Sequence, residues 1–122
     1  MVLVDTSVWI SHLRYGNAGL SDLLMEGKVL CHPFVIGELA CGNLSNRDEI
    51  LALLSELPQA TLLENDEIPA FIERNKPAGL GIGLIDVHLL ASARLSGASV
   101  WTMDKRLQNA AKRVKILFDP AG

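Results

Sequence analysis

The chain has 122 residues, of which 49% are hydrophobic, and its formal net charge is −3 at pH 7. This length predicts one domain, over residues 1–122, that can bury a core without disulfides or a structural metal. A membrane span is not expected, because no apolar run reaches roughly eighteen residues, and the acidic balance argues against a general DNA-coating protein.

The first half of the chain predicts short strands that alternate with helices. Thr6 or Ser7 can cap a helix after the first strand, and Pro33 suits the first turn of another helix. Ser45 and Asp48 resemble a capping box at the start of a later helix. The expected ranges are a strand over 2–4, helices over 6–13 and 20–26, a strand over 29–32, and helices over 33–41 and 45–57.

The second half continues the alternation and adds a glycine-rich connection. Glycine occupies every other position from 79 to 83, which favours a flexible segment before a long apolar helix. The expected ranges are a strand over 61–63, a helix over 65–76, the connection over 77–83, a helix over 84–95, a strand over 98–102, a helix over 105–112 and a strand over 115–118. This alternation predicts an α/β protein with a parallel sheet and helices on both faces.

Four acidic residues stand out from this pattern. Asp5 and Asp104 each follow an expected strand, so both should project at the carboxyl edge of the sheet, where ligands gather, although each could simply cap the next helix. Glu38 and Asp86 are the only charges in two long apolar stretches of the chain. An ionised carboxylate in such surroundings needs a cation, hydrogen bonds or a raised pKa. For Asp86, an early helical position favoured by the helix dipole is a milder explanation.

If the fold brings these four carboxylates together, they repel one another and need a compensating cation. A set of oxygen ligands without Cys or convergent His suits Mg²⁺ or Mn²⁺ rather than zinc. Such a site can activate water and neutralise a phosphate under attack. Nearby hydroxyl groups that could orient the ligands belong to Thr6, Ser7 and Thr102.

Four segments follow one another in a fixed order along nearly the whole chain: V-D-T-S-V-W, V-I-G-E-L, G-L-I-D-V-H-L-L-A-S-A and T-M-D-K-R-L. Together they resemble the PIN-domain family and are similar to the VapC-type toxins of toxin–antitoxin pairs. The resemblance implies a three-layer α/β/α fold around a mainly parallel sheet of about four to five strands. It matches the family's acidic metal-site positions to Asp5, Glu38, Asp86 and Asp104, and its hydroxyl positions to Thr6 or Ser7 and to Thr102.

The resemblance also implies an activity and partners. The activity is Mg²⁺- or Mn²⁺-dependent endonucleolytic hydrolysis of RNA that leaves a 5′-phosphate and a 3′-hydroxyl. The implied partners are a second copy of the chain, in a homodimer, and a VapB-like antitoxin that blocks the acidic pocket. An apolar segment could accommodate the antitoxin or could equally pack in the core; it contains Trp9, Ile10, Leu13, Leu20, Leu23 and Leu24.

The C-terminal end of the chain is locally basic. Lys105 and Lys112 are seven positions apart, as are Arg106 and Arg113, so each pair lies on roughly one face of a helix. Since these charges begin directly after Asp104, they could hold RNA phosphates near the metal; taken alone, they describe a solvated helix face.

Several alternatives stay open at this point. A receiver domain or a haloacid-dehalogenase-type phosphatase fits less well, because Asp5 lacks the second acid that either would require. A PIN-like module that binds RNA or protein without cleavage is possible, as is an RNA-processing PIN nuclease without an antitoxin. The three histidines, His12, His32 and His88, are expected to be structural or peripheral. We expect a cytoplasmic protein, because the N-terminus lacks the basic start of a signal peptide and the two cysteines form no zinc or redox motif.

Overall fold

The computed structural model describes residues 1–75 and 81–121 as three short strands and a larger set of helices. The strands are β1 (Val2–Val4), β2 (Val29–Leu30) and β3 (Ser99–Trp101). The helices are α1 (Thr6–Tyr15), α2 (Ala18–Met25), α3 (Pro33–Cys41), α4 (Arg47–Glu56), α5 (Ile68–Asn75), α6 (Leu84–Leu95) and α7 (Lys105–Arg113), with a short 3₁₀ helix, η1 (Asn65–Glu67), before α5.

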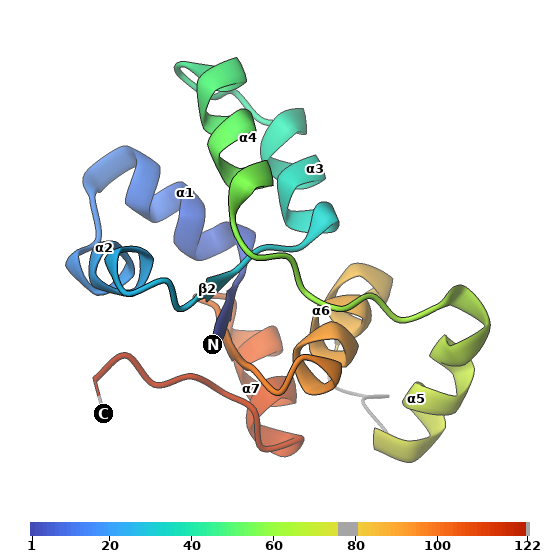
Figure 1. Cartoon of the computed structure of the whole chain (residues 1–122). Helices are drawn as coiled ribbons and strands as arrows, with labels where there is room; N and C mark the ends of the chain where they lie inside the picture. The colour runs from blue at the N-terminus through green and yellow to red at the C-terminus, as the bar shows by residue number, and fades with distance from the viewer. Residues whose placement is uncertain (76–80, 122) are drawn as a thin grey trace.

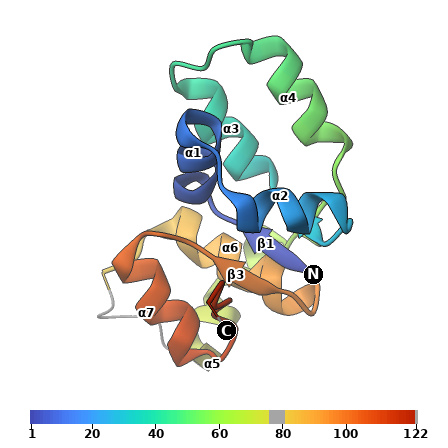
Figure 2. The same cartoon turned by 90° about the vertical axis from the view of Figure 1, so that its left-hand side faces the viewer.

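The sheet has the order β2-β1-β3, and both strand pairs are parallel. Val2 pairs with Val29 on one side and with Ser99 on the other, so β1 is the central strand. Figures 1 and 2 show helices α1–α4 on one side of the sheet and α5–α7 on the other. The prediction of an α/β fold with a parallel sheet between helical layers is therefore confirmed.

The described sheet is narrower than the expected four to five strands. In place of the strand expected over 61–63, Cys31 forms a single bridge with Gln59. Cys31 exchanges hydrogen bonds with Pro58 O and the N–H of Ala60, and pairing stops there because the next residue that would donate is Pro33, which has no backbone N–H and begins α3. In place of the strand expected over 115–118, one bridge joins Val100 and Leu117.

Helix α6 is the most buried helix of the chain and packs against β1 and β3. Leu89, Leu90 and Ala93 are fully inaccessible, which agrees with the apolar stretch that predicted this helix. The same core contains Trp9 and Leu20, with exposed fractions of 4% and 0%. Those two residues of the apolar segment therefore serve the core rather than a partner surface.

His32 connects the start of α3 to α6. Its Nδ1 accepts the backbone N–H of Phe34 at 3.0 Å, which caps α3, and its Nε2 lies 3.1 Å from Ser92 Oγ in α6. Burial, and secondly the charge of His88, lowers the pKa of His32 to about 4. A neutral ring that accepts at Nδ1 carries its proton on Nε2 and donates it to Ser92. The contact fixes α3, which contains Glu38, relative to α6, which contains Asp86.

Of two further expectations about helix ends, one is wrong and the other falls partly outside the described residues. The capping box expected from Ser45 and Asp48 is wrong: α4 begins at Arg47, and its N-cap residue Asn46 has φ 53° and makes no side-chain capping bond. The connection expected over 77–83 lies partly outside the described residues, as does the helix end expected at Lys76.

Within residues 1–75 and 81–121, no helix is long and apolar enough to cross a membrane.

Candidate active site

The carboxyl ends of β1 and β3 bring two of the predicted acids to one edge of the sheet. Asp5 follows β1 directly, and its backbone N–H donates to Trp101 O, at the end of β3, at 2.9 Å. Asp104 lies three residues beyond Trp101 and is the N-cap residue of α7. Glu38 lies on α3, and Asp86 lies in the first turn of α6.

Asp5 is held by the hydroxyl groups of two neighbouring segments. Ser7 Oγ and Thr102 Oγ1 both donate to Asp5 Oδ2, at 2.9 and 2.7 Å. The two hydroxyl oxygens are themselves fixed, because the backbone N–H of Met103 donates to Ser7 Oγ and that of Asp104 donates to Thr102 Oγ1. Since Asp5 is only 7% exposed, this network compensates the cost of burying its carboxylate.

Glu38 is held by a third hydroxyl group, that of Thr6. Thr6 Oγ1 donates to Glu38 Oε1 at 3.1 Å, which joins the first turn of α1 to α3. The structure therefore gives contacts to both residues that the resemblance offered as alternatives: Thr6 contacts Glu38, and Ser7 contacts Asp5.

The sequence left two roles open for Asp104, a helix cap and a member of the acidic site, and Asp104 has both. Its Oδ1 accepts the backbone N–H groups of Arg106 and Leu107, at 2.8 and 3.3 Å, so it caps α7 as the simpler explanation expects. The negative charge of Asp104 also contributes to the raised pKa of Asp86. Capping fixes the carboxylate of Asp104 at the sheet edge without neutralising it.

Asp86 shows most directly that the four carboxylates share one environment. Its pKa is raised to about 6, first by burial and then by the negative charges of Asp5, Asp104 and Glu38. A hydrogen bond with the backbone of Gly83 acts in the opposite direction. The favourable early-turn position therefore does not offset the repulsion, and Asp86 remains at a disadvantage when ionised.

The donor set fits a divalent cation in chemistry. All four groups are carboxylates, and within residues 1–75 and 81–121 none of them forms an ion pair with Lys or Arg. The four carboxylates are not yet positioned to coordinate one ion. Among the described residues, no group of three or more His, Cys, Asp or Glu side chains is already arranged to hold an ion. An ion would therefore have to draw the carboxylates together.

A family model for the PIN domain matches residues 2–113. The chain belongs to the PIN-domain family. Its curated relatives include the protein named Ribonuclease VapC32 in two strains of Mycobacterium tuberculosis, CDC 1551 / Oshkosh and ATCC 25618 / H37Rv. Each is 47% identical to the chain over 111 residues, which cover 90% of both sequences. The resemblance to VapC-type PIN domains is thus confirmed.

The basic residues predicted to hold substrate lie at the two ends of α7 in this PIN domain. Lys105 and Arg106 directly follow Asp104, and a Cβ atom placed on Gly81 would lie 3.3 Å from Arg106 Cδ, so the Arg106 side chain extends toward the segment before α6. Lys112 and Arg113 are at the other end of the helix, roughly 10 Å further along its axis. Only the first pair is close to the acids along the chain.

Arg14 is a feature of this PIN domain that the sequence did not single out. It lines a cavity of about 400 Å³ that also has Glu38 in its wall. Thr6, Ile10 and Arg14 follow one another at intervals of four, so they share one face of α1, and this spacing was the available signal.

Proposed function

We propose that this PIN domain is a VapC-type toxin that hydrolyses RNA endonucleolytically with Mg²⁺ or Mn²⁺. The observation that carries the proposal is the placement of four acids at one edge of the sheet: Asp5 follows β1, Asp104 follows β3, Glu38 accepts a hydrogen bond from Thr6 beside Asp5, and Asp86 lies in the first turn of α6. Burial, and then the charges of the other three acids, raise the pKa of Asp86, and none of the four forms an ion pair with Lys or Arg among the described residues. Relatives named as ribonucleases, 47% identical over 111 residues, support the same activity.

In this proposal, Asp5, Glu38, Asp86 and Asp104 hold the cation. The bound cation supplies the Lewis acidity that activates water and offsets charge on the phosphate. Ser7 and Thr102 orient Asp5, and Thr6 orients Glu38, through the hydrogen bonds already described. Hydrolysis then leaves a 5′-phosphate and a 3′-hydroxyl.

Lys105 and Arg106 are the cations best placed to hold RNA phosphates beside the acids, since they begin α7 directly after Asp104. Lys112 and Arg113 would contact RNA further along the strand. An RNA phosphate is the natural counterpart of this arrangement, because it can bind the cation at the acids and the basic side chains at the same time.

A VapB-like antitoxin would bind a neighbouring face of α1. There a cavity of about 210 Å³ lies between α1, α2 and α4, with lining residues that include Trp9, Leu24 and Leu53. Leu53 is 58% exposed, and the buried indole Nε1 of Trp9 has no hydrogen-bond partner among the described residues. An apolar partner segment would cover Leu53, whereas Trp9 stays in the core beneath it.

A homodimer is supported by a second apolar surface, between α3 and the start of α6. Phe34, Leu84 and Ile85 are 39%, 63% and 43% exposed, and they line a groove of about 600 Å³ that also includes Glu38. Sedimentation of the purified protein over a range of concentrations measures this association.

The proposed activity is tested with purified protein free of antitoxin, incubated with mixed cellular RNA and Mg²⁺, Mn²⁺ or EDTA. A matched Asp5→Asn/Asp86→Asn variant is the control. We expect discrete fragments that require the metal and are made only by the unaltered protein. Folded, metal-bound protein that leaves all RNA intact would instead favour a PIN-like binding module.

Toxin function is tested separately from nuclease activity. Coexpression with the neighbouring open reading frame should rescue growth and yield a copurifying complex. Cleavage of RNA without any such rescue would favour an RNA-processing PIN nuclease that has no antitoxin.

A further inference from the structure

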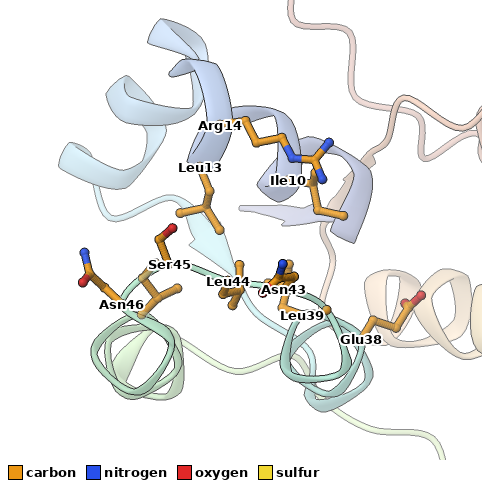
Figure 3. A pocket seen from close by; sticks show the side chains of 11 residues that line it. Ile10, Leu13, Arg14, Glu38, Leu39, Asn43, Leu44, Ser45 and Asn46 are labelled. Atoms are coloured by element: carbon orange, nitrogen blue, oxygen red, sulfur yellow. The ribbon is translucent and has the colours of Figure 1, made fainter.

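A cavity of about 400 Å³ lies beside the acidic site, between α1, α3 and the connection from α3 to α4. Figure 3 shows Leu13 pointing from α1 toward the connection and the Arg14 side chain extending along α1 beside Ile10, with Asn43, Ser45 and Asn46 spread along the connection. Glu38 lies at one end of the cavity. The volume falls in the range of about 300–1,000 Å³ that is typical of pockets for small organic groups.

The polar groups of this cavity are not used by the fold. Within residues 1–75 and 81–121, the side chains of Asn43, Ser45 and Asn46 make no hydrogen bond, and Arg14 makes neither a hydrogen bond nor an ion pair. Arg47, one position beyond Asn46, is different: its guanidinium donates to Ala40 O at 3.3 and 3.0 Å. The cavity therefore offers one free cation, two free amides and one free hydroxyl.

The cavity shares one residue, Glu38, with the acidic site. Thr6, which donates to Glu38, and Arg14, which lines the cavity, lie on the same face of α1 with Ile10 between them. Glu38 belongs to both places, because it accepts from Thr6 and also forms part of the cavity wall. A strand of RNA with one phosphate at the acids would therefore bring a flanking nucleotide to the cavity.

Resting on the proposed ribonuclease function, we propose that this cavity binds one unpaired RNA base next to the scissile phosphate. The amides of Asn43 and Asn46 and the hydroxyl of Ser45 bond the edge of the base, and Arg14 bonds the adjoining phosphate. Proteins read single-stranded RNA by stacking against the bases and by hydrogen bonds to their exposed edges, and an amide offers both donors and an acceptor for the latter. Ile10, Leu39 and Leu44 supply an apolar wall for the base.

The chemistry of this cavity favours a base over a protein segment. A partner helix or strand buries apolar side chains, and the adjoining cavity, whose lining includes Leu24 and Leu53, suits that purpose. Three free hydrogen-bonding side chains beside a free guanidinium match the polar edge and the phosphate of a nucleotide.

The test measures binding apart from cleavage, so that the two proposals can fail separately. An Asp5→Asn background removes cleavage, and the protein is equilibrated with a pool of randomised single-stranded RNA whose bound fraction is sequenced. Asn43→Ala/Asn46→Gly removes both amides, and glycine at 46 keeps the positive φ of 53° without strain. Lys28→Gln removes a surface cation at the opposite edge of the sheet and serves as the control for Arg14→Gln.

We expect the parent protein to prefer one base at one position, and Asn43→Ala/Asn46→Gly to reduce that preference about tenfold, since a good pair of hydrogen bonds to a base is worth roughly 1–3 kcal/mol. Arg14→Gln should weaken binding of every sequence and reduce the salt dependence by about one phosphate contact, whereas Lys28→Gln should change neither. An unchanged base preference and salt dependence in the variants would overturn the proposal. So would unchanged RNA binding together with lost copurification of an antitoxin, which would assign the cavity to a protein partner.

Discussion

The two sides of the acidic site differ in how the fold treats their carboxylates. On the side of β1 and β3, Asp5 is buried and accepts hydrogen bonds from Ser7 and Thr102. On the side of α6, Asp86 has no hydroxyl partner among the described residues, and burial and three neighbouring acids raise its pKa to about 6. The protein itself stabilises the carboxylate of Asp5, whereas the carboxylate of Asp86 needs a bound cation to balance its charge.

The largest expected effect comes from removing a hydroxyl partner of Asp5, since Asp86 has none among the described residues. Thr102→Val removes a 2.7 Å hydrogen bond to Asp5 Oδ2 and leaves the buried carboxylate with less support. We expect the affinity for Mn²⁺, measured by calorimetry, to fall by about 10–100-fold, as is typical when a group that orients a metal ligand is lost. Thr61→Val is the matched control, because Thr61 is exposed and its bond to Ser96 uses only the backbone. Equal affinity in the two variants would show that the network around Asp5 has no part in metal binding.

A smaller effect is expected at Asp86, where a substitution should raise the stability of the metal-free protein. Because its pKa is raised in the folded state, the folded protein binds more protons than the unfolded chain between about pH 4 and 6, and stability falls as the pH rises through that window. Asp86→Asn should therefore stabilise the metal-free protein above pH 6, by about 1 kcal/mol after allowance for solvent screening. Below about pH 4 the carboxyl is protonated in both states, and the gain should vanish. Thermal unfolding in EDTA at pH 4 and pH 8 checks both parts, and a gain of equal size at the two pH values would contradict the electrostatic explanation.

The smallest effect concerns the two ends of α7. Lys105→Gln/Arg106→Gln should reduce the slope of log affinity for RNA against log salt concentration by about two, because two phosphate contacts next to the acids are lost. Lys112→Gln/Arg113→Gln removes the same charge at the far end of the helix and should weaken binding less. The measurement is a salt titration of RNA binding with an Asp5→Asn protein. Equal losses for the two pairs would mean that α7 acts only through its total charge.

The sequence predicted four acids at one site, which stays a prediction, and it overestimated the extent of the sheet. Asp5, Glu38, Asp86 and Asp104 were recognisable because each stands in a short motif or is alone among apolar residues. The strand over 61–63 was not formed, because its neighbour ends after Cys31, where α3 begins at Pro33 and offers no further backbone N–H. A local apolar pattern does not show where the neighbouring strand ends.

Helix caps and cavities depend on the same long-range information. The pair Ser45 and Asp48 had the right spacing for a capping box, but Asn46 takes the left-handed conformation and α4 begins after it. Arg14 had no distinguishing motif, since its role arises only when α1 packs against α3 and the following connection. His32 was expected to be structural, which agrees with its burial, yet its link to Ser92 required the fold.

The most direct test of the central claim is thermal unfolding of the unaltered protein and Asp86→Asn at pH 8, in EDTA and in excess Mg²⁺ or Mn²⁺. A ligand that binds only the folded state raises its stability, so the cation should raise the Tm of the unaltered protein and barely that of the variant. We predict that the order of the two Tm values reverses: the variant melts higher in EDTA, and the unaltered protein melts higher with the metal. Equal shifts of both proteins, or no shift of either, would contradict the claim that the four carboxylates form a cation site.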